Sequence, residues 1–187
     1  MKGMLKGVAA LAVATALFAS TAQAQTAVQF GIGGGVTLPL SDFDDDAELG
    51  FHGLATAEFR PASLPVGVRV DGMYHRNGFA EDLGFDGNFQ TISGTLNAVY
   101  TFQTAAESKF HPYIIAGAGA YNFKANFSDA DDDSETKFGA NGGAGFNFGV
   151  GGAAVFVEGR FHNIFTSGTD VSMVPITVGV KFGGSAQ

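Results

Sequence analysis

Apolar and polar residues alternate along most of this chain with a period of two, the pattern of a strand that has two different faces. The alternation is clear in six segments, at residues 28–38, 66–75, 91–102, 138–148, 155–162 and 176–182. Residues 51–59 and 113–127 follow it less cleanly because they are rich in Ala and Gly. The mature chain shows no helical repeat of apolar residues. The sequence therefore predicts an all-β fold of eight strands, most of them about ten residues long, the length of a tilted membrane-spanning strand.

The connections between the predicted strands alternate in length. Long loops at 41–50, 76–87, 128–136 and 166–170 alternate with shorter turns at 61–65, 104–110 and 149–152. Most of the 18 acidic residues lie in the long loops. This predicts an antiparallel up-and-down β-barrel with acidic loops at one end, and with the short turns and both termini at the other.

The first 24 residues have the features of a secretory signal peptide. Lys2 and Lys6 form a basic start, an apolar run covers residues 7–18, and Ala22-Gln23-Ala24 is a small-residue cleavage site. The apolar run is too short for a spanning helix, which needs roughly 20 residues. We expect residues 1–24 to be a cleaved signal peptide and residues 25–187 to form one barrel domain.

The composition of the chain excludes several classes of site and partner. The 187 residues contain no Cys, which rules out disulfides, thiolate metal sites and a Cys nucleophile. The formal net charge of −8 argues against a nucleic-acid partner, because nucleic-acid binding needs clustered Lys and Arg.

The residues on the polar face indicate which face of the barrel is inside. That face is mostly Gly, Ser, Thr and Asn, and such residues suit the narrow lumen of an eight-stranded barrel better than a water-exposed surface. The apolar face carries aromatic residues near the strand ends, as in the girdles of membrane barrels. These residues are Phe30, Phe59, Tyr74, Tyr100, Phe102, Tyr113, Phe148 and Phe182. We therefore predict a transmembrane barrel with its apolar face in lipid.

Five charged residues share the inward face on three predicted strands: Glu58, Arg69, Asp71, Glu158 and Arg160. Buried charges must be paired, and the two signs nearly balance in this set. We predict a structural network that closes the lumen. The alternative is a set of charges that lines a narrow channel.

Three segments make the chain resemble a known family: residues 111–121 (HPYIIAGAGAY), 138–145 (FGANGGAG) and 156–161 (FVEGRF). With the signal peptide, they are similar to the small eight-stranded outer-membrane β-barrels of Gram-negative bacteria, the group of the outer membrane protein A barrel, outer membrane protein X and the opacity-type adhesins. The resemblance implies a monomer in the outer membrane, in contact with lipid and lipopolysaccharide. It also implies a final-strand signal for the barrel assembly machinery, carried here by Ile176, Val178, Val180 and Phe182. Unlike many members, this chain continues beyond Phe182, through residues 183–187.

The sequence gives only weak signals for an ion-binding site. Asp129, Asp131 and Asp133 have the start of a calcium-loop spacing, but Ser134 and Ala140 stand where such a loop needs Gly and Glu, so a solvated acidic loop is favoured. The four histidines, at 52, 75, 111 and 162, are too scattered along the sequence to indicate a metal site.

Enzymes on this scaffold include lipid A deacylases, which use a His-x-Ser pair with an acid behind it. Here Ile164 follows His162 at the second position, Ser167 is five residues away, and the next acid is Asp170. We therefore expect no catalytic residues, no cofactor and no metal. The sequence favours a non-catalytic outer-membrane protein with a role in envelope integrity or surface interaction; a narrow porin-like channel and a surface adhesin remain alternatives.

Overall fold

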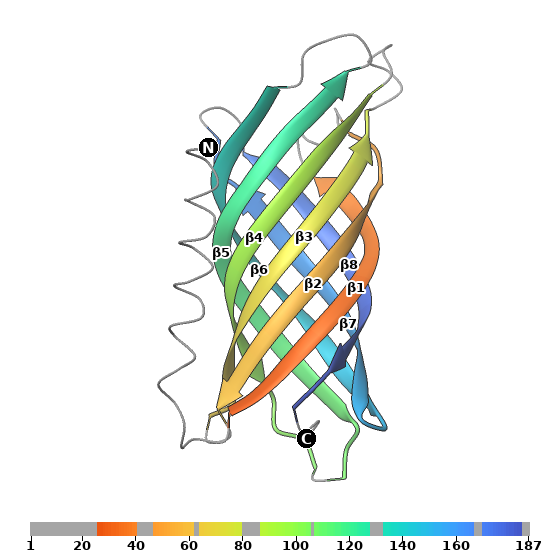
Figure 1. The fold of residues 1–187 in the computed structure, drawn as a ribbon, viewed down its shortest axis with the longest axis vertical. Helices are drawn as coiled ribbons and strands as arrows, with labels where there is room; N and C mark the ends of the chain where they lie inside the picture. The colour runs from red at the N-terminus through yellow and green to blue at the C-terminus, as the bar shows by residue number, and fades with distance from the viewer. Residues whose placement is uncertain are drawn as a thin grey trace, which may run out of the picture.

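Eight antiparallel strands close into a barrel (Figure 1). The computed structural model describes residues 26–40, 47–61, 64–79, 87–105, 107–127, 133–166 and 170–184. The strands are β1 (Thr26–Leu40), β2 (Gly50–Pro61), β3 (Val66–Gly78), β4 (Gly87–Thr101), β5 (Phe110–Phe127), β6 (Asp133–Val150), β7 (Ala153–Ile164) and β8 (Val171–Phe182). The predicted fold class is confirmed. The predicted signal peptide at 1–24 lies outside the described residues, and so do most of the acidic positions in the predicted loops.

Each strand pairs with its neighbour in sequence, and β1 pairs with β8 to close the ring. Phe30 lies opposite Phe182 and Leu40 opposite Ser172 at the two ends of the closing register. Closure leaves no sheet edge, which a bilayer requires because it offers no water to unpaired backbone groups. The described residues include no helix that is long and apolar enough to cross a membrane.

Several strands extend into segments that the sequence predicted as loops. β3 continues through Arg76 to Gly78, and β6 already begins at Asp133. Beyond β3, Phe79 still forms an isolated bridge with Ala47. The reason is that backbone pairing needs no apolar side chains, so it continues after the alternation stops. Because Asp133 belongs to a strand, the three aspartates of the calcium-like spacing do not all lie in one loop; Asp129 and Asp131 are outside the described residues.

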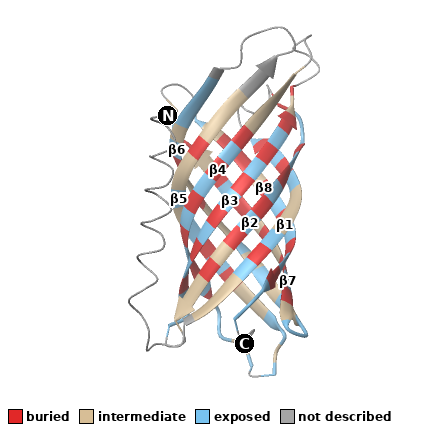
Figure 2. Ribbon diagram, in the orientation of Figure 1, coloured by how far each residue is buried: buried red, intermediate tan, exposed pale blue. Residues whose placement is uncertain are grey.

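Burial alternates along the strands, and Figure 2 shows it as a chequered pattern of buried and exposed residues. The polar set is inside: Arg69 is fully buried in β3, while Val68 and Val70 beside it are exposed on the outer face. Apolar side chains on the other strands are similarly exposed, with Ile32 at 62% and Phe138 at 73%. The predicted assignment of the two faces is confirmed.

Tyr113 is the exception to the predicted aromatic girdle. Its side chain is 1% exposed and lies in the lumen, because its partner in register, Thr101, also faces inward. The prediction was wrong because the Ala- and Gly-rich segment at 113–127 has no clear polar face. The outward position next to it belongs to Ile114, which is half exposed.

Inward-facing glycines of β6 make room for these large lumen side chains. A Cβ built on Gly145 would lie 2.6 Å from the hydroxyl oxygen of Tyr113, and one on Gly143 would lie 2.7 Å from Cα of Arg160. Both distances are shorter than real Cβ contacts. The Gly-rich sequence of β6 is therefore a packing requirement of the lumen.

Candidate functional site in the barrel lumen

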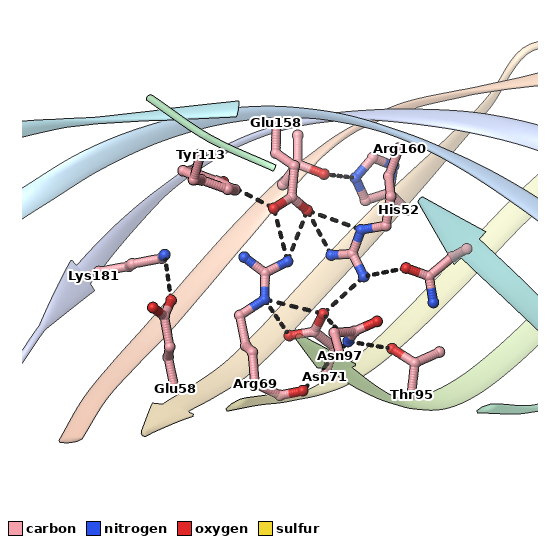
Figure 3. Close-up of polar contacts among 12 residues, drawn as sticks. His52, Glu58, Arg69, Asp71, Thr95, Asn97, Tyr113, Glu158, Arg160 and Lys181 are labelled. Carbon is pink, nitrogen blue, oxygen red and sulfur yellow. Dashed lines mark hydrogen bonds and ion pairs between the residues drawn. The ribbon is translucent and has the colours of Figure 1, made fainter. Parts of the chain in front are cut away.

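Four charged side chains meet across the middle of the lumen (Figure 3). Arg69 and Asp71 come from β3, and Glu158 and Arg160 come from β7 on the opposite wall. Arg69 Nη2 lies 2.7 Å from Glu158 Oε2, and Arg160 Nη1 lies 2.8 Å from Asp71 Oδ2. Within each strand, Arg69 Nε is 3.0 Å from Asp71 Oδ1 and Arg160 Nη2 is 2.5 Å from Glu158 Oε1. We call these four residues the central ion cluster.

The sequence builds the central ion cluster from two short motifs. In a strand, residues two apart point to the same face, so Arg-x-Asp on β3 and Glu-x-Arg on β7 each present a pair to the lumen. The strands run in the same direction, and the order of the charges is reversed between them. Each guanidinium therefore faces a carboxylate of the opposite wall, and none of the four side chains is more than 2% exposed.

Neutral side chains add hydrogen bonds to the carboxylates. Asn97 Nδ2 donates to Asp71 Oδ2 at 3.0 Å, and Tyr113 Oη donates to Glu158 Oε2 at 2.8 Å. These donors come from β4 and β5, so the cluster ties together more strands than those that carry its charges. Buried charges are tolerated when they are both paired and hydrogen-bonded in this way.

The fifth predicted residue, Glu58, belongs to a separate group nearer the short turns. Its Oε2 lies 2.9 Å from Lys181 Nζ of β8, and its Oε1 contacts Arg60 Nη2 of β2. Lys181 is 1% exposed. The sequence interpretation missed Lys181 as a partner, although its inward position on the last strand was a usable signal.

Three of the four histidines also meet in the lumen, on the side of the central ion cluster away from Lys181. The ring centroids of His52 and His75 are 5.4 Å apart, and those of His75 and His162 are 6.3 Å apart. The sequence interpretation missed this group because their positions are scattered along the chain; the register pairs His52 directly with His75, and closure brings β7 opposite. His111 lies elsewhere, with Nδ1 3.0 Å from the hydroxyl of Thr104.

Hydroxyl groups hold these three imidazoles. Thr37 Oγ1 lies 3.0 Å from Nδ1 of both His52 and His75, and His162 Nδ1 lies 2.8 Å from the hydroxyl of Tyr121. In the part of the chain that the structure describes, no group of three or more His, Asp or Glu side chains is arranged to hold a metal ion.

Of the residues considered for catalysis, the structure describes His162 and Asp170, and these two are not brought together. His162 points into the lumen, whereas Asp170 accepts hydrogen bonds from Asn163 Nδ2 and the Thr166 amide. Ser167 lies outside the described residues.

The residues of the predicted assembly signal lie on β8 and face outward. β8 ends at Phe182, and the two glycines that follow have positive φ angles of 82° and 69°. Signal recognition by the assembly machinery stays a prediction. The described residues of the signal are Ile176, Val178, Val180 and Phe182, which are 37–55% exposed.

A cavity of about 680 Å³ opens at the short-turn end of the lumen. Arg60, Thr101, Lys109, His111 and Asn147 contribute polar groups to its lining. Arg60 connects this cavity to the ion pair of Glu58 and Lys181. Its side chain lines the cavity and also contacts Glu58.

An apolar outer face, a closed strand ring and an ion-paired polar lumen define a transmembrane β-barrel. Residues 9–182 match the family model described as outer membrane protein beta-barrel domain, and the chain belongs to this family. The protein is therefore an outer-membrane protein. No curated protein matches the chain.

Solved structures show the same fold. Neisserial surface protein A matches with a TM-score of 0.61 and 19% identity, covering 84% of this chain and 96% of its own. A major outer membrane protein from Thermus thermophilus matches with 0.61 and 13%, covering 85% and 99%. The outer membrane protein OprG from Pseudomonas aeruginosa matches with 0.57 and 17%, covering 86% and 98%. At these identities the likeness concerns the fold alone.

Proposed function

We propose that the protein is a non-catalytic outer-membrane barrel whose lumen is closed by side chains, with a role in envelope integrity or surface interaction. The observation that supports this most directly is the central ion cluster. Its four buried charges join β3 to β7 through direct contacts of 2.7 and 2.8 Å, with no room for water between the paired atoms. An eight-stranded barrel has a lumen that its side chains just fill.

The energetics distinguish a closed lumen from a narrow channel. In a closed lumen, removing one partner leaves the other as an uncompensated buried charge, which typically costs about 3–5 kcal/mol. In a water-filled channel, solvent would screen the remaining charge, and the substitution would alter ion selectivity rather than stability.

Arg160→Ala tests this proposal. We expect the variant to lower the free energy of unfolding by about 3–5 kcal/mol, because Asp71 and Glu158 each lose a partner. Unfolding is followed by the mobility shift of the barrel on gels and by circular dichroism, and the same sample is placed in a planar bilayer to measure conductance.

Lys109→Ala is the matched control, because it removes an exposed cation at the short-turn end. It should stay within about 0.5 kcal/mol of the wild type. Unchanged stability of Arg160→Ala together with altered conductance would overturn the closed lumen in favour of a channel.

We also propose that the long-loop end faces the outside of the cell and the short-turn end the periplasm, by analogy with membrane barrels in general. Acidic loops at the outer end would then be available for surface contacts. Deleting residues 42–46 or 129–132 and measuring attachment to host-derived surfaces separates an adhesin from a purely structural protein: lost attachment with unchanged barrel stability would favour the adhesin.

A further inference from the structure

The cavity at the short-turn end of the lumen carries excess positive charge, in a chain with a formal net charge of −8. At its inner end one carboxylate serves two cations: Glu58 Oε2 lies 2.9 Å from Lys181 Nζ, and Glu58 Oε1 contacts Arg60 Nη2. Glu107 and Lys109 also belong to the lining, but both are exposed and their charges cancel. The group of Glu58, Lys181 and Arg60 therefore has one positive charge in excess, whereas the central ion cluster is balanced.

The inner end of this cavity is closed. Lys181 Nζ lies over the rings of Tyr113 and Phe156, 5.0 and 5.5 Å from their centroids. These three side chains and Glu58 are each no more than 1% exposed. Tyr113 in turn donates a hydrogen bond to Glu158 of the central ion cluster, and Figure 3 shows it between that cluster and the pair of Glu58 and Lys181. The cavity is therefore a pocket that opens at the short-turn end and ends blindly inside the barrel.

An ordered turn forms much of the wall of the pocket. The connection between β4 and β5, drawn in green at the lower end of Figure 1, contributes more lining residues than any strand. Backbone hydrogen bonds hold both of its ends: the Phe102 amide donates to the Pro112 carbonyl at 3.0 Å, and the Gly149 amide donates to the Lys109 carbonyl at 2.8 Å. The pocket is thus built before a ligand arrives, as small-molecule sites usually are.

Three buried polar atoms of lining residues have no hydrogen-bond partner among the described residues. They are Arg60 Nε, Thr101 Oγ1 and Asn147 Oδ1. Thr101 is 8% exposed, and the side chain of Arg60 is 23% exposed. Buried polar groups are normally satisfied in folded proteins, so three of them around one pocket indicate a ligand that completes their hydrogen bonding. Such a ligand needs both donors and acceptors, because the three atoms include both kinds.

We propose that this pocket binds a small hydroxylated monocarboxylate, a molecule of the sugar-acid class. Its carboxylate lies against the Arg60 guanidinium, whose planar fork suits a carboxylate, and its hydroxyl groups meet Thr101 and Asn147. The cavity volume of about 680 Å³ lies in the range of small-molecule sites. The blind inner end rests on the closed lumen proposed above; the excess charge and the unpartnered polar atoms do not.

The charge of the pocket selects this ligand over other polar molecules. One carboxylate matches the single excess positive charge. A phosphate group, with a charge of about −1.5 to −2 at neutral pH, would exceed it. A zwitterion brings its own ammonium group and would leave the excess uncompensated. A neutral sugar would satisfy the polar atoms but not the charge.

The test measures ligand binding to the mature barrel, folded in a neutral detergent, by isothermal titration calorimetry. The probes are gluconate, glucose, serine and inorganic phosphate. We expect gluconate to bind with a dissociation constant of about 1 mM or tighter, and each of the other three to bind about tenfold more weakly or worse.

Arg60→Gln should weaken gluconate binding about tenfold or more, because a hydrogen-bonded ion pair with the ligand is lost. The barrel should still fold, since Glu58 keeps Lys181 as its partner, and the mobility shift on gels checks this. Arg76→Gln is the matched control, because it removes an exposed arginine of β3 at the other end of the barrel and should leave the affinity unchanged.

Gln103→Glu tests the charge match without removing a contact of Arg60. Gln103 is exposed and lines the pocket, so the new carboxylate neutralises the excess charge and should weaken gluconate binding severalfold. This variant decides the matter if Arg60→Gln does not fold.

Absence of gluconate binding to the wild type, or unchanged affinity in a folded Arg60→Gln barrel or in Gln103→Glu, would overturn the proposal. Glucose or serine binding as tightly as gluconate would overturn the charge match, and phosphate binding as tightly would overturn the choice of a carboxylate. Conductance of the same wild-type sample in a planar bilayer separates these failures from that of the proposed function. A conducting barrel contradicts the closed lumen, whatever its affinity for gluconate.

Discussion

At the scale of single residues, the lumen shows how a neutral side chain makes buried charge tolerable. Glu158 has two oxygens and three partners: both arginines of the central ion cluster and the hydroxyl of Tyr113. Each partner occupies a lone pair that water would otherwise solvate. Tyr113 was predicted for the membrane girdle, and its role became visible only when its face of the strand was known.

Replacing Tyr113 by Phe removes this donor and keeps the ring. We expect a loss of about 1.5–3 kcal/mol in the free energy of unfolding, because a hydrogen bond to a buried charged group disappears. Tyr100→Phe is the control, since Tyr100 faces outward and is 38% exposed; its effect should stay within about 0.5 kcal/mol. The measurement is urea unfolding in lipid vesicles, and equal effects of both substitutions would contradict this role of Tyr113.

At the scale of the strand, β6 shows why a barrel that is filled by side chains needs glycine. Its inward positions face the large side chains of β5 and β7, and a Cβ on the glycines there would lie less than 3 Å from backbone or side-chain atoms, whereas on the outer face a Cβ on Gly142 would meet only one atom, at 3.7 Å. The alternation of the sequence revealed β6 as a strand, but only the packing explains why its inward residues include Gly139, Gly143 and Gly145.

Gly145→Ala should therefore destabilise the barrel by about 1–3 kcal/mol, the usual range for an overpacked interior. The added Cβ would lie 2.5 Å from the carbonyl oxygen of Val157 and 2.6 Å from the hydroxyl oxygen of Tyr113. Gly72→Ala adds the same methyl group to the outer face, where nothing lies within 4 Å, and should be close to neutral. Thermal unfolding of both variants decides the matter; a neutral Gly145→Ala would show that β6 can move to make room.

At the scale of the whole molecule, the two ends of the barrel differ, and this difference makes its orientation testable. The chain has no Cys, so a thiol-specific reagent would label only a single introduced cysteine and would show whether that position is accessible. Leu49 lies near the long-loop end and is 60% exposed, and Glu107 is exposed in the turn between β4 and β5.

A membrane-impermeant maleimide should label Leu49→Cys on intact cells, because the long-loop end is proposed to face outward. Glu107→Cys should react only after the outer membrane has been permeabilised. Labelling yields are read by mass shift on gels, with the wild type as the blank. The reverse pattern would invert the proposed orientation.

The sequence alone determined the local features: the strands, their two faces, and the inward position of Arg69, Asp71, Glu158 and Arg160. It could do so because the side of a sheet to which a residue points follows from a period of two, which neighbouring residues set. The strand ends were less well determined, because backbone pairing extends beyond the apolar pattern into β3 and β6.

Only the tertiary structure decided which inward or outward residues meet. Barrel closure and the register between strands set those contacts, and both depend on all eight strands together. They pair Glu58 with Lys181, gather His52, His75 and His162 from distant positions, and put Arg76 beside Lys124 across one strand. Such contacts depend on how strands that are far apart in the chain pair and pack. The pattern of residues along a single strand carries no information about that pairing.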